Sequence, residues 1–297
     1  MTNTVQHRPG GTGRLAGRDV ARIGYGAMQL VERGDRPQLD EAAAVAVLRR
    51  ARELGVDHLD TAQFYGDGVA NAFIRAALHP YDDALTLVSK VGAERRPGDG
   101  LVPAQRPTEL RAQVEANLRT LGADRLAAVN LRRMDARPGI VADGDQLVDL
   151  DSQLAELVAL RDEGKIGGIG LSNVSAEQVQ AALPVGPVCV QNADNLLDRH
   201  DGLLALCAAH DIAWVPFFPL GSAFPGAAKV VGDATVQRVA ARLGVTPAQV
   251  GLAWLLARDP HVLLICGTAD VGHLAENVAA GSVELDAAAL AELDAVA

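Results

Sequence analysis

Cysteine is scarce in this 297-residue chain, and its three cysteines, Cys189, Cys207 and Cys266, are widely spaced among apolar residues. This pattern argues against a disulfide framework and indicates reduced core residues, as in a reducing cytosol. No apolar run is long enough to span a bilayer, and residues 1–13 are polar and glycine-rich, without the apolar stretch of a signal peptide. We therefore expect a cytoplasmic protein with no membrane partner.

Clustered basic residues are also missing. The formal net charge is −10, and no stripe of lysine and arginine reverses it locally, so nucleic acid and anionic lipid would be repelled. With 49% hydrophobic and 22% charged residues, the chain has ample material for a globular core. We expect no nucleic-acid partner and a monomer by default, with a homo-oligomer as the alternative.

Three signatures of other enzyme classes are absent as well. No G-x-G-x-x-G turn follows an early apolar run, which argues against a doubly wound dinucleotide fold. Gly221-Ser222 lacks the strand-to-helix setting of a G-x-S-x-G elbow, which disfavours a hydrolase. The seven histidines show no spacing typical of a zinc or iron site, so we predict no metal.

What the chain does contain is a regular alternation of apolar runs and amphipathic stretches. Eight short apolar runs span residues 21–26, 56–60, 85–90, 126–131, 166–171, 188–191, 212–217 and 261–266. Helical periodicity lies between them, at 40–54, 108–121, 151–162, 176–183, 202–209, 235–243 and 247–257. Runs that are apolar on both faces are typical of a parallel sheet covered by helices.

The alternation predicts an α/β protein, a single-domain (β/α)8 TIM barrel over residues 1–297. Residues 1–19 would form an N-terminal arm or a hairpin over the barrel floor, and residues 284–297 a terminal helix on the outside. The loops 94–106, 134–146 and 222–232 would form the substrate pocket. Their proline, glycine and aspartate content predicts irregular structure.

Polar residues at the ends of neighbouring runs suggest a proton donor, because barrel active sites form at the carboxyl ends of the strands. Asp60 ends the second run, Tyr65 follows it, and Lys90 ends the third. An ammonium group stabilises the phenolate left when a tyrosine donates its proton, and a carboxylate holds the ammonium in place. Together they would protonate a carbonyl oxygen, with hydride from a bound cofactor. Singly, they could be a loop cap, a packed aromatic and a surface lysine.

The motifs in their order resemble the aldo-keto reductase superfamily over nearly the whole chain. They are Asp60-Thr61-Ala62-x-x-Tyr65-Gly66, Ser89-Lys90, Gly170-Leu171-Ser172-Asn173, Val190-Gln191-Asn192, Pro219-Leu220-Gly221 and Glu276-Asn277. The runs 24–30, 129–132 and 215–221 look most like the bacterial pyridoxal reductase branch. The resemblance implies NAD(P)H-dependent reduction of a small carbonyl substrate, an aldehyde such as pyridoxal or a ketone, to the alcohol.

The resemblance also implies a role for each matching residue. Tyr65 would be the general acid, with Lys90 and Asp60 as its charge partners. The cofactor site would comprise Gly26, Met28, Asp60, Ser172, Asn173, Gln191, Phe217, Pro219, Leu220, Gly221, Gly267, Thr268, His273, Glu276 and Asn277. Within it, Ser172, Asn173 and Gln191 would hold the nicotinamide carboxamide, and Phe217 would stack on the ring. From the residues alone, Ser172 and Asn173 could instead cap a helix, and Phe217 could be a rim hydrophobe.

Two residues depart from the superfamily pattern. Arg132 stands where a histidine commonly helps to bind the carbonyl, and an arginine stays charged. It would donate hydrogen bonds to the carbonyl oxygen, anchor an anionic substrate group, or pair structurally with Asp135 or another carboxylate. Asp270 would repel the 2′-phosphate of NADPH if it pointed inward. NADPH is therefore the expected cofactor, with NADH as the alternative.

Three other interpretations stay open. The protein could be a nucleotide-binding sensor or regulator with little turnover, for which Arg132 is the motive. It could instead reduce a secondary-metabolite sugar or polyketide carbonyl. A barrel lyase or isomerase that binds a phosphorylated substrate through Arg132 would need no nicotinamide at all.

Overall fold

A parallel sheet of eight strands forms the centre of the molecule in a computed structural model that describes the chain except residues 1–7, 32–37, 97, 136–139, 222–227 and 297. The strands are β3 (Ile23–Gly26), β4 (His58–Asp60), β5 (Thr86–Val91), β8 (Ala128–Arg132), β9 (Ile169–Ser172), β10 (Cys189–Gln191), β11 (Ala213–Trp214) and β12 (Leu264–Ile265). They lie in the order β11-β10-β9-β8-β5-β4-β3-β12. Each overlaps one of the eight predicted runs.

The sheet curls until its two edge strands meet. The Trp214 amide donates to the His261 carbonyl at 2.9 Å, and the Leu263 amide donates to the Trp214 carbonyl at 2.8 Å. A parallel bridge between Trp214 and Val262 thus joins β11 to the chain entering β12. The predicted (β/α)8 barrel is confirmed.

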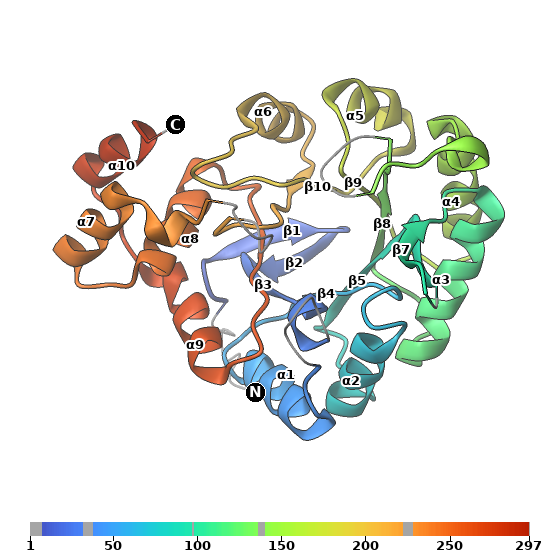
Figure 1. Cartoon of the computed structure of the whole chain (residues 1–297), viewed down its shortest axis with the longest axis horizontal. Coiled ribbons are helices and arrows are strands. Elements are labelled where there is room, and N and C mark those ends of the chain that lie inside the picture. Colours follow the sequence, from blue (N-terminus) through green and yellow to red (C-terminus); the bar gives the residue numbers. More distant parts are fainter. Residues whose placement is uncertain (1–7, 32–37, 97, 136–139, 222–227, 297) are drawn as a thin grey trace, which may run out of the picture.

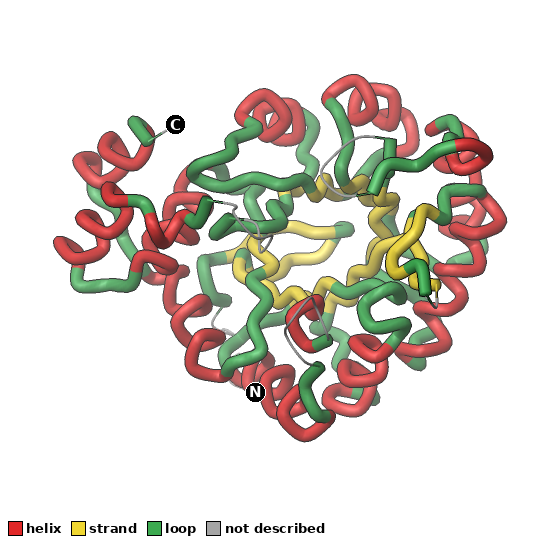
Figure 2. Tube along the Cα trace, viewed as in Figure 1, coloured by secondary structure: helices red, strands yellow, loops and turns green. Residues whose placement is uncertain are grey.

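Helices surround the sheet (Figures 1 and 2). They are α1 (Glu41–Glu53), α2 (Val69–Leu78), α3 (Pro107–Leu121), α4 (Leu150–Asp162), α5 (Ala176–Ala182), α6 (Asp201–Ala209), α7 (Ala234–Leu243), α8 (Pro247–Arg258), α9 (Val271–Ala279) and α10 (Ala287–Asp294). Local chemistry sets their ends: the Asp40 carboxylate accepts the Ala43 amide at the start of α1, and Gly122 ends α3 with φ 67°. Short 3-10 turns are η1 (Ala27–Leu30), η2 (Gly144–Gln146), η3 (Leu183–Val185), η4 (Val230–Gly232) and η5 (Ala280–Ser282).

An N-terminal hairpin closes the amino-terminal end of the barrel. It consists of β1 (Thr12–Leu15) and β2 (Arg18–Ala21), paired antiparallel. Leu15 and Val20 are buried against inward-facing residues such as Val88 and Ala128. The barrel interior can therefore be reached by a ligand only from the opposite end.

A second hairpin, β6 (Ala93–Arg96) and β7 (Gly100–Pro103), lies over the opposite end. This corrects the prediction that the whole segment 94–106 is irregular. Gly98 and Gly100 adopt φ values of 87° and 76°, which a tight turn between the two strands needs. The other two predicted loops lie partly outside the described residues, at 136–139 and 222–227.

The three cysteines are free and buried, as predicted. Burial raises the pKa of the Cys207 and Cys266 thiols to about 12, so these residues are poor nucleophiles at neutral pH. Over the described part of the chain, no single helix has the length and apolar character to cross a membrane. The helices α7 and α8, bent by 95° at their junction, meet that test only as a pair.

Candidate active site

A cavity of about 670 Å³ opens at the carboxyl ends of the strands. Many of the predicted site residues line it: Gly26, Met28, Asp60, Tyr65, Lys90, Arg132, Phe217, Pro219, Leu220, Gly221, Gly267 and Asn277. They come from β3, β4, β5, β8 and the segments that follow β11 and β12. The barrel thus gathers at one end residues that are far apart in the sequence.

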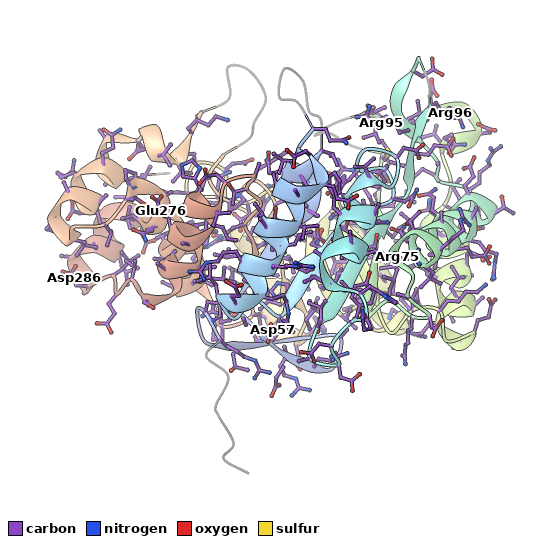
Figure 3. All side chains as sticks on the ribbon, turned by 90° about the horizontal axis from the view of Figure 1, so that it is seen from below. Asp57, Arg75, Arg95, Arg96, Glu276 and Asp286 are labelled. Carbon is purple, nitrogen blue, oxygen red and sulfur yellow. The ribbon has the colours of Figure 1, made fainter. Side chains whose placement is uncertain are left out.

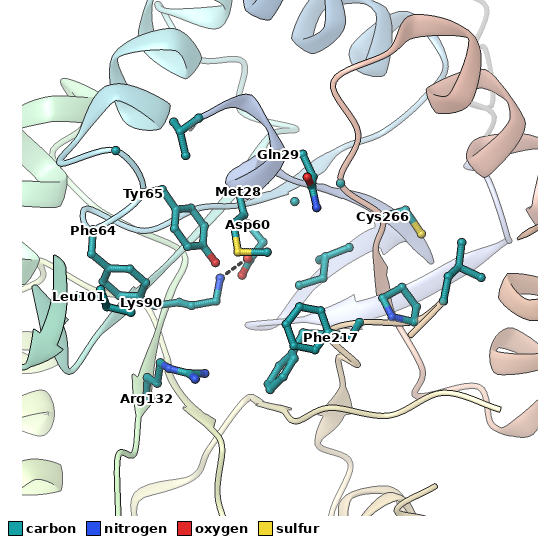
Figure 4. Close-up of a pocket in the computed structure, with 18 of the residues that line it drawn as sticks. Met28, Gln29, Asp60, Phe64, Tyr65, Lys90, Leu101, Arg132, Phe217 and Cys266 are labelled. Atoms are coloured by element: carbon teal, nitrogen blue, oxygen red, sulfur yellow. Dashed lines mark hydrogen bonds and ion pairs between the residues drawn. The ribbon is translucent and has the colours of Figure 1, made fainter. Parts of the chain in front are cut away.

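Asp60 and Lys90 form a buried ion pair at the bottom of this cavity (Figure 4). Their side chains are only 3% and 6% exposed. The other carboxylate oxygen of Asp60 accepts a hydrogen bond from the Gln191 side-chain amide at 2.7 Å, and Lys90 Nζ also donates to the Thr61 carbonyl at 3.3 Å. Parallel pairing of β4 with β5 brings the two charges together.

The Tyr65 hydroxyl points toward this pair (Figure 4). Lys90 Nζ lies 5.1 Å from the centre of the Tyr65 ring. Burial alone would lower the pKa of the Lys90 ammonium, but the Asp60 charge, the nearby Tyr65 oxygen and the hydrogen bond to Asp60 raise that pKa above its ordinary value. The lysine is therefore cationic at neutral pH and lies beside the phenol.

The turn after Tyr65 depends on glycine. Gly66 has φ 61°, and a Cβ there would lie 3.0 Å from Val31 Cγ1. The chain can therefore reverse closely beneath the Val31 side chain, which directs the Tyr65 ring into the cavity. Phe64 packs edge-on against that ring, with centroids 5.2 Å apart.

Arg132, at the end of β8, directs its guanidinium into the cavity, 5.8 Å from the centre of the Phe217 ring. Burial lowers its pKa from the ordinary value, and the nearby Tyr65 opposes that shift. The predicted structural pairing with Asp135 is wrong, because Arg133 makes that contact, with Nη2 2.6 Å from Asp135 Oδ2. Successive residues at a strand end point to opposite faces, so Arg133 faces outward and Arg132 inward.

Ser172, Asn173 and Gln191 are buried, at 0%, 8% and 1% exposure, and do not belong to the described lining of the cavity, although Gln191 contacts Asp60, which does. The Ser172 hydroxyl oxygen and Gln191 Oε1 have no hydrogen-bond partner in the described part of the chain. Buried polar atoms normally have one, so this pair fits a bound amide, which both donates and accepts. The alternative of a helix cap is wrong, since Ser175 and Gln178 form the capping box of α5.

Close backbone contacts shape the cavity wall that is formed by the segments after β11 and β12. A Cβ on Gly267 would lie 2.5 Å from the Gly26 carbonyl oxygen, and one on Gly221 would lie 2.4 Å from the Ala228 carbonyl oxygen. Glycine is needed at both positions because any larger residue would push these segments apart. Phe217, which precedes this wall, stands between it and Arg132.

At the start of α9, the Asp270 side chain acts as a helix cap. Asp270 caps the helix by accepting the His273 amide at 2.8 Å, and this bond lowers the pKa of its carboxyl. Its own amide donates to Thr268 Oγ1 at 3.1 Å. Thr268, His273 and Glu276 do not belong to the described lining of the cavity, whereas Asn277 does.

Sequence reasoning missed several residues of the lining. Gln29, Val31, Phe64, Gly66, Phe218, Leu252, Ile265 and Cys266 also face the cavity, whereas Arg95, Leu101, Met134 and Ile140 come from the predicted pocket loops 94–106 and 134–146. Most are apolar, and apolar residues near strand ends carry no signal that separates a pocket wall from the core. No group of three or more metal-ligating side chains occurs in the described ranges.

Comparisons with known proteins agree with this geometry. The family model "Aldo/keto reductase family" matches residues 22–297. Pyridoxine 4-dehydrogenase of Escherichia coli (strain K12) is 45% identical over 285 residues, 95% of this chain and 96% of that protein. An uncharacterized oxidoreductase of Schizosaccharomyces pombe is 33% identical over 297 residues, covering 99% and 92% of the two chains.

Solved structures place the fold in the same group. An aldo-keto reductase from Klebsiella pneumoniae in complex with NADPH superposes with a TM-score of 0.78 at 27% identity, covering 96% of this chain and 94% of that one. The predicted resemblance is confirmed by both kinds of comparison. The chain belongs to the aldo/keto reductase family and is an NAD(P)H-dependent oxidoreductase.

Proposed function

We propose that the protein reduces an aldehyde to the alcohol with NADPH, with Tyr65 as the general acid and pyridoxal as the first substrate to test. The aldehyde, NADPH and one proton give the alcohol and NADP⁺. The observation that carries the proposal is the placement of Tyr65 beside the Lys90–Asp60 pair in an open cavity, with Lys90 Nζ 5.1 Å from the centre of the Tyr65 ring. The cofactor supplies the hydride when bound.

The cofactor site rests on the polar atoms left without partners. Ser172 Oγ and Gln191 Oε1 would hold the nicotinamide carboxamide, and Phe217 would cover its ring. Asp270 is engaged on the α9 amides, with its side chain 63% exposed. This carboxylate therefore does not need to face a 2′-phosphate, which supports NADPH over NADH.

Tyr65 donates its proton to the carbonyl oxygen as the carbon is reduced. The Lys90 ammonium stabilises the phenolate that forms, and Asp60 keeps that ammonium charged and in place. Arg132 donates hydrogen bonds to the carbonyl oxygen, where negative charge develops. Lys90 thus stabilises the Tyr65 oxygen and Arg132 the carbonyl oxygen, the two atoms between which the proton moves.

The substrate assignment rests on the pocket walls and on a relative. Phe64, Leu101 and Met134 face the cavity and suit a flat aromatic body. The Escherichia coli relative, 45% identical, is a pyridoxine 4-dehydrogenase, and pyridoxal is the oxidised partner of pyridoxine. A monomer in the cytosol completes the proposal, consistent with three free, buried cysteines.

The test compares NADPH oxidation with pyridoxal for the wild type, Tyr65→Phe and Tyr81→Phe. Tyr81 is the matched control, because its hydroxyl donates to the Leu121 carbonyl on the outer side of the barrel. Loss of the general acid is expected to lower kcat by about 10²–10⁴-fold, while NADPH binding, followed by cofactor fluorescence, persists. Tight NADPH binding without turnover of any aldehyde by the wild type would instead favour a sensor.

A further inference from the structure

The β6–β7 hairpin directs one arginine toward the cavity. In the antiparallel register Arg95 lies opposite Leu101, and cross-strand partners share a face. Both residues line the cavity. Glu94 and Arg96 are the neighbours of Arg95 along the strand, so they share the other face, where Arg96 Nε lies 2.5 Å from Glu94 Oε1.

Arg95 has no ion-pair partner in the parts of the chain that the structure describes, in contrast to Arg96. It also borders a neighbouring cavity of about 280 Å³ together with Asp67, Arg96, Gly98 and Gly100. Asp67 makes no ion pair with it in those same ranges. Figure 3 shows Arg95 and Arg96 at one end of the molecule, with Asp57 of the barrel floor at the other.

The charge of the large cavity is opposite in sign to that of the protein. Its described lining holds one carboxylate, Asp60, and three cationic groups, Lys90, Arg95 and Arg132, whereas the whole chain carries a net charge of −10. Lys90 is neutralised by Asp60, and Arg132 lies deep, next to Tyr65 and Phe217. Arg95, on the hairpin, is therefore the cation positioned to contact the end of a substrate that lies away from its carbonyl group.

We propose that Arg95 binds an anionic group of the carbonyl substrate, a carboxylate or a phosphate, and so determines specificity. This inference rests on the proposed function. The carbonyl lies at Tyr65 and Arg132, the apolar body lies against Phe64 and Leu101, and the anion reaches the hairpin. An arginine fork suits both anions, since it donates two parallel hydrogen bonds to either.

The test uses two pairs of aldehydes, each consisting of a compound with a distal anionic group and its counterpart without that charge. Pyridoxal 5′-phosphate and pyridoxal form the phosphate pair, and 4-formylbenzoate and its methyl ester form the carboxylate pair. The measured quantity is the ratio of kcat/KM for the anion to kcat/KM for its neutral partner. It is compared between wild type, Arg95→Gln and Arg96→Gln, so that differences in intrinsic reactivity cancel.

Arg95→Gln is expected to lower this ratio by about 10-fold, because a hydrogen-bonded charge contact is lost, and to do so through KM with kcat nearly unchanged. Arg96→Gln removes the same charge from a side chain that does not line the large cavity and is expected to leave the ratio unchanged. Added salt should weaken the preference of the wild type and leave Arg95→Gln unaffected. A fall in either pair supports the proposal and identifies the anion.

Two results would overturn the assignment. An unchanged ratio in Arg95→Gln means that the residue does not bind the anion. An equal fall in both variants means that only the general field of the hairpin acts. If the wild type reduces none of the four aldehydes, the proposed function is refuted, and this inference with it. If the wild type reduces them without any preference for the anion, only this inference is refuted.

Discussion

The buried pair of Asp60 and Lys90 makes a strong prediction about stability. Removing one partner leaves the other charge in a site where the two side chains are only 3% and 6% exposed. Such a loss costs about 3–5 kcal/mol, whereas replacing both partners with neutral groups is often nearly neutral. We therefore expect Asp60→Asn and Lys90→Met each to destabilise the fold by about 3–5 kcal/mol, and the double variant to be more stable than either single variant.

The measurement is a double-mutant cycle by urea unfolding at neutral pH, followed by far-ultraviolet circular dichroism. Neutral pH lies in the correct window: the pKa of Lys90 is raised in the folded state, so its stabilising contribution is complete below the unfolded value of about 10.4 and is lost only as pH rises through the folded value. Lys165 and Glu115, 2.7 Å apart on the surface, provide the control cycle, with an expected coupling below about 1 kcal/mol.

Activity should separate from stability in this cycle. All three variants at the buried site should lose turnover, because none keeps a fixed ammonium beside the Tyr65 hydroxyl, including the double variant that regains stability. If the destabilisations of the two single variants simply add in the double variant, the charges are not coupled. Asp60 then does not hold Lys90 as the charge partner of Tyr65.

Two further predictions concern the scaffold. A Cβ at Gly24 would lie 2.1 Å from His58 Nε2, so Gly24→Ala should destabilise the fold by about 1–3 kcal/mol in urea unfolding. Adding His58→Ala to this variant should recover part of the lost stability, because the smaller side chain makes room for the new methyl group. No recovery in the double variant would show that the two residues do not clash. Burial opposes a raised pKa at His261, but hydrogen bonds and charges from Asp259 and Asp211 prevail, so its stabilising contribution should be complete below about pH 6.5 and fade as pH rises through the folded pKa. Unfolding free energies measured against pH should lose this slope in His261→Gln, and an identical slope would refute the assignment.

The sequence was sufficient to predict the barrel and the proximity of Asp60, Tyr65 and Lys90 for one physical reason. In a parallel barrel the carboxyl ends of neighbouring strands meet at one rim, so polar residues that end successive apolar runs must converge. Asp60 and Lys90 fulfil this rule through the pairing of β4 with β5. Tyr65 lies in the short turn after Asp60, which is bounded by Gly66, so it is placed at the same rim.

The remaining features depend on contacts between segments that no local pattern specifies. The β6–β7 hairpin has polar and charged residues on one strand and little alternation on the other, so its pairing register, and with it the direction of Arg95, is invisible before the chain is folded. The exchange of Arg132 for Arg133 as the partner of Asp135 has a similar origin, because a strand end must be placed to within one residue to assign its faces. Boundaries are the least predictable part of a strand, and here a single step decides which arginine enters the site.

The inward position of Arg132 also explains how the site can work without a histidine at this strand end. A histidine changes its charge near neutrality, so its help to a reacting carbonyl would vary with pH. Burial lowers the pKa of Arg132, but arginine does not deprotonate in proteins at physiological pH. With Lys90 held cationic by Asp60 as well, both cations near the developing oxyanion are permanent across the neutral range.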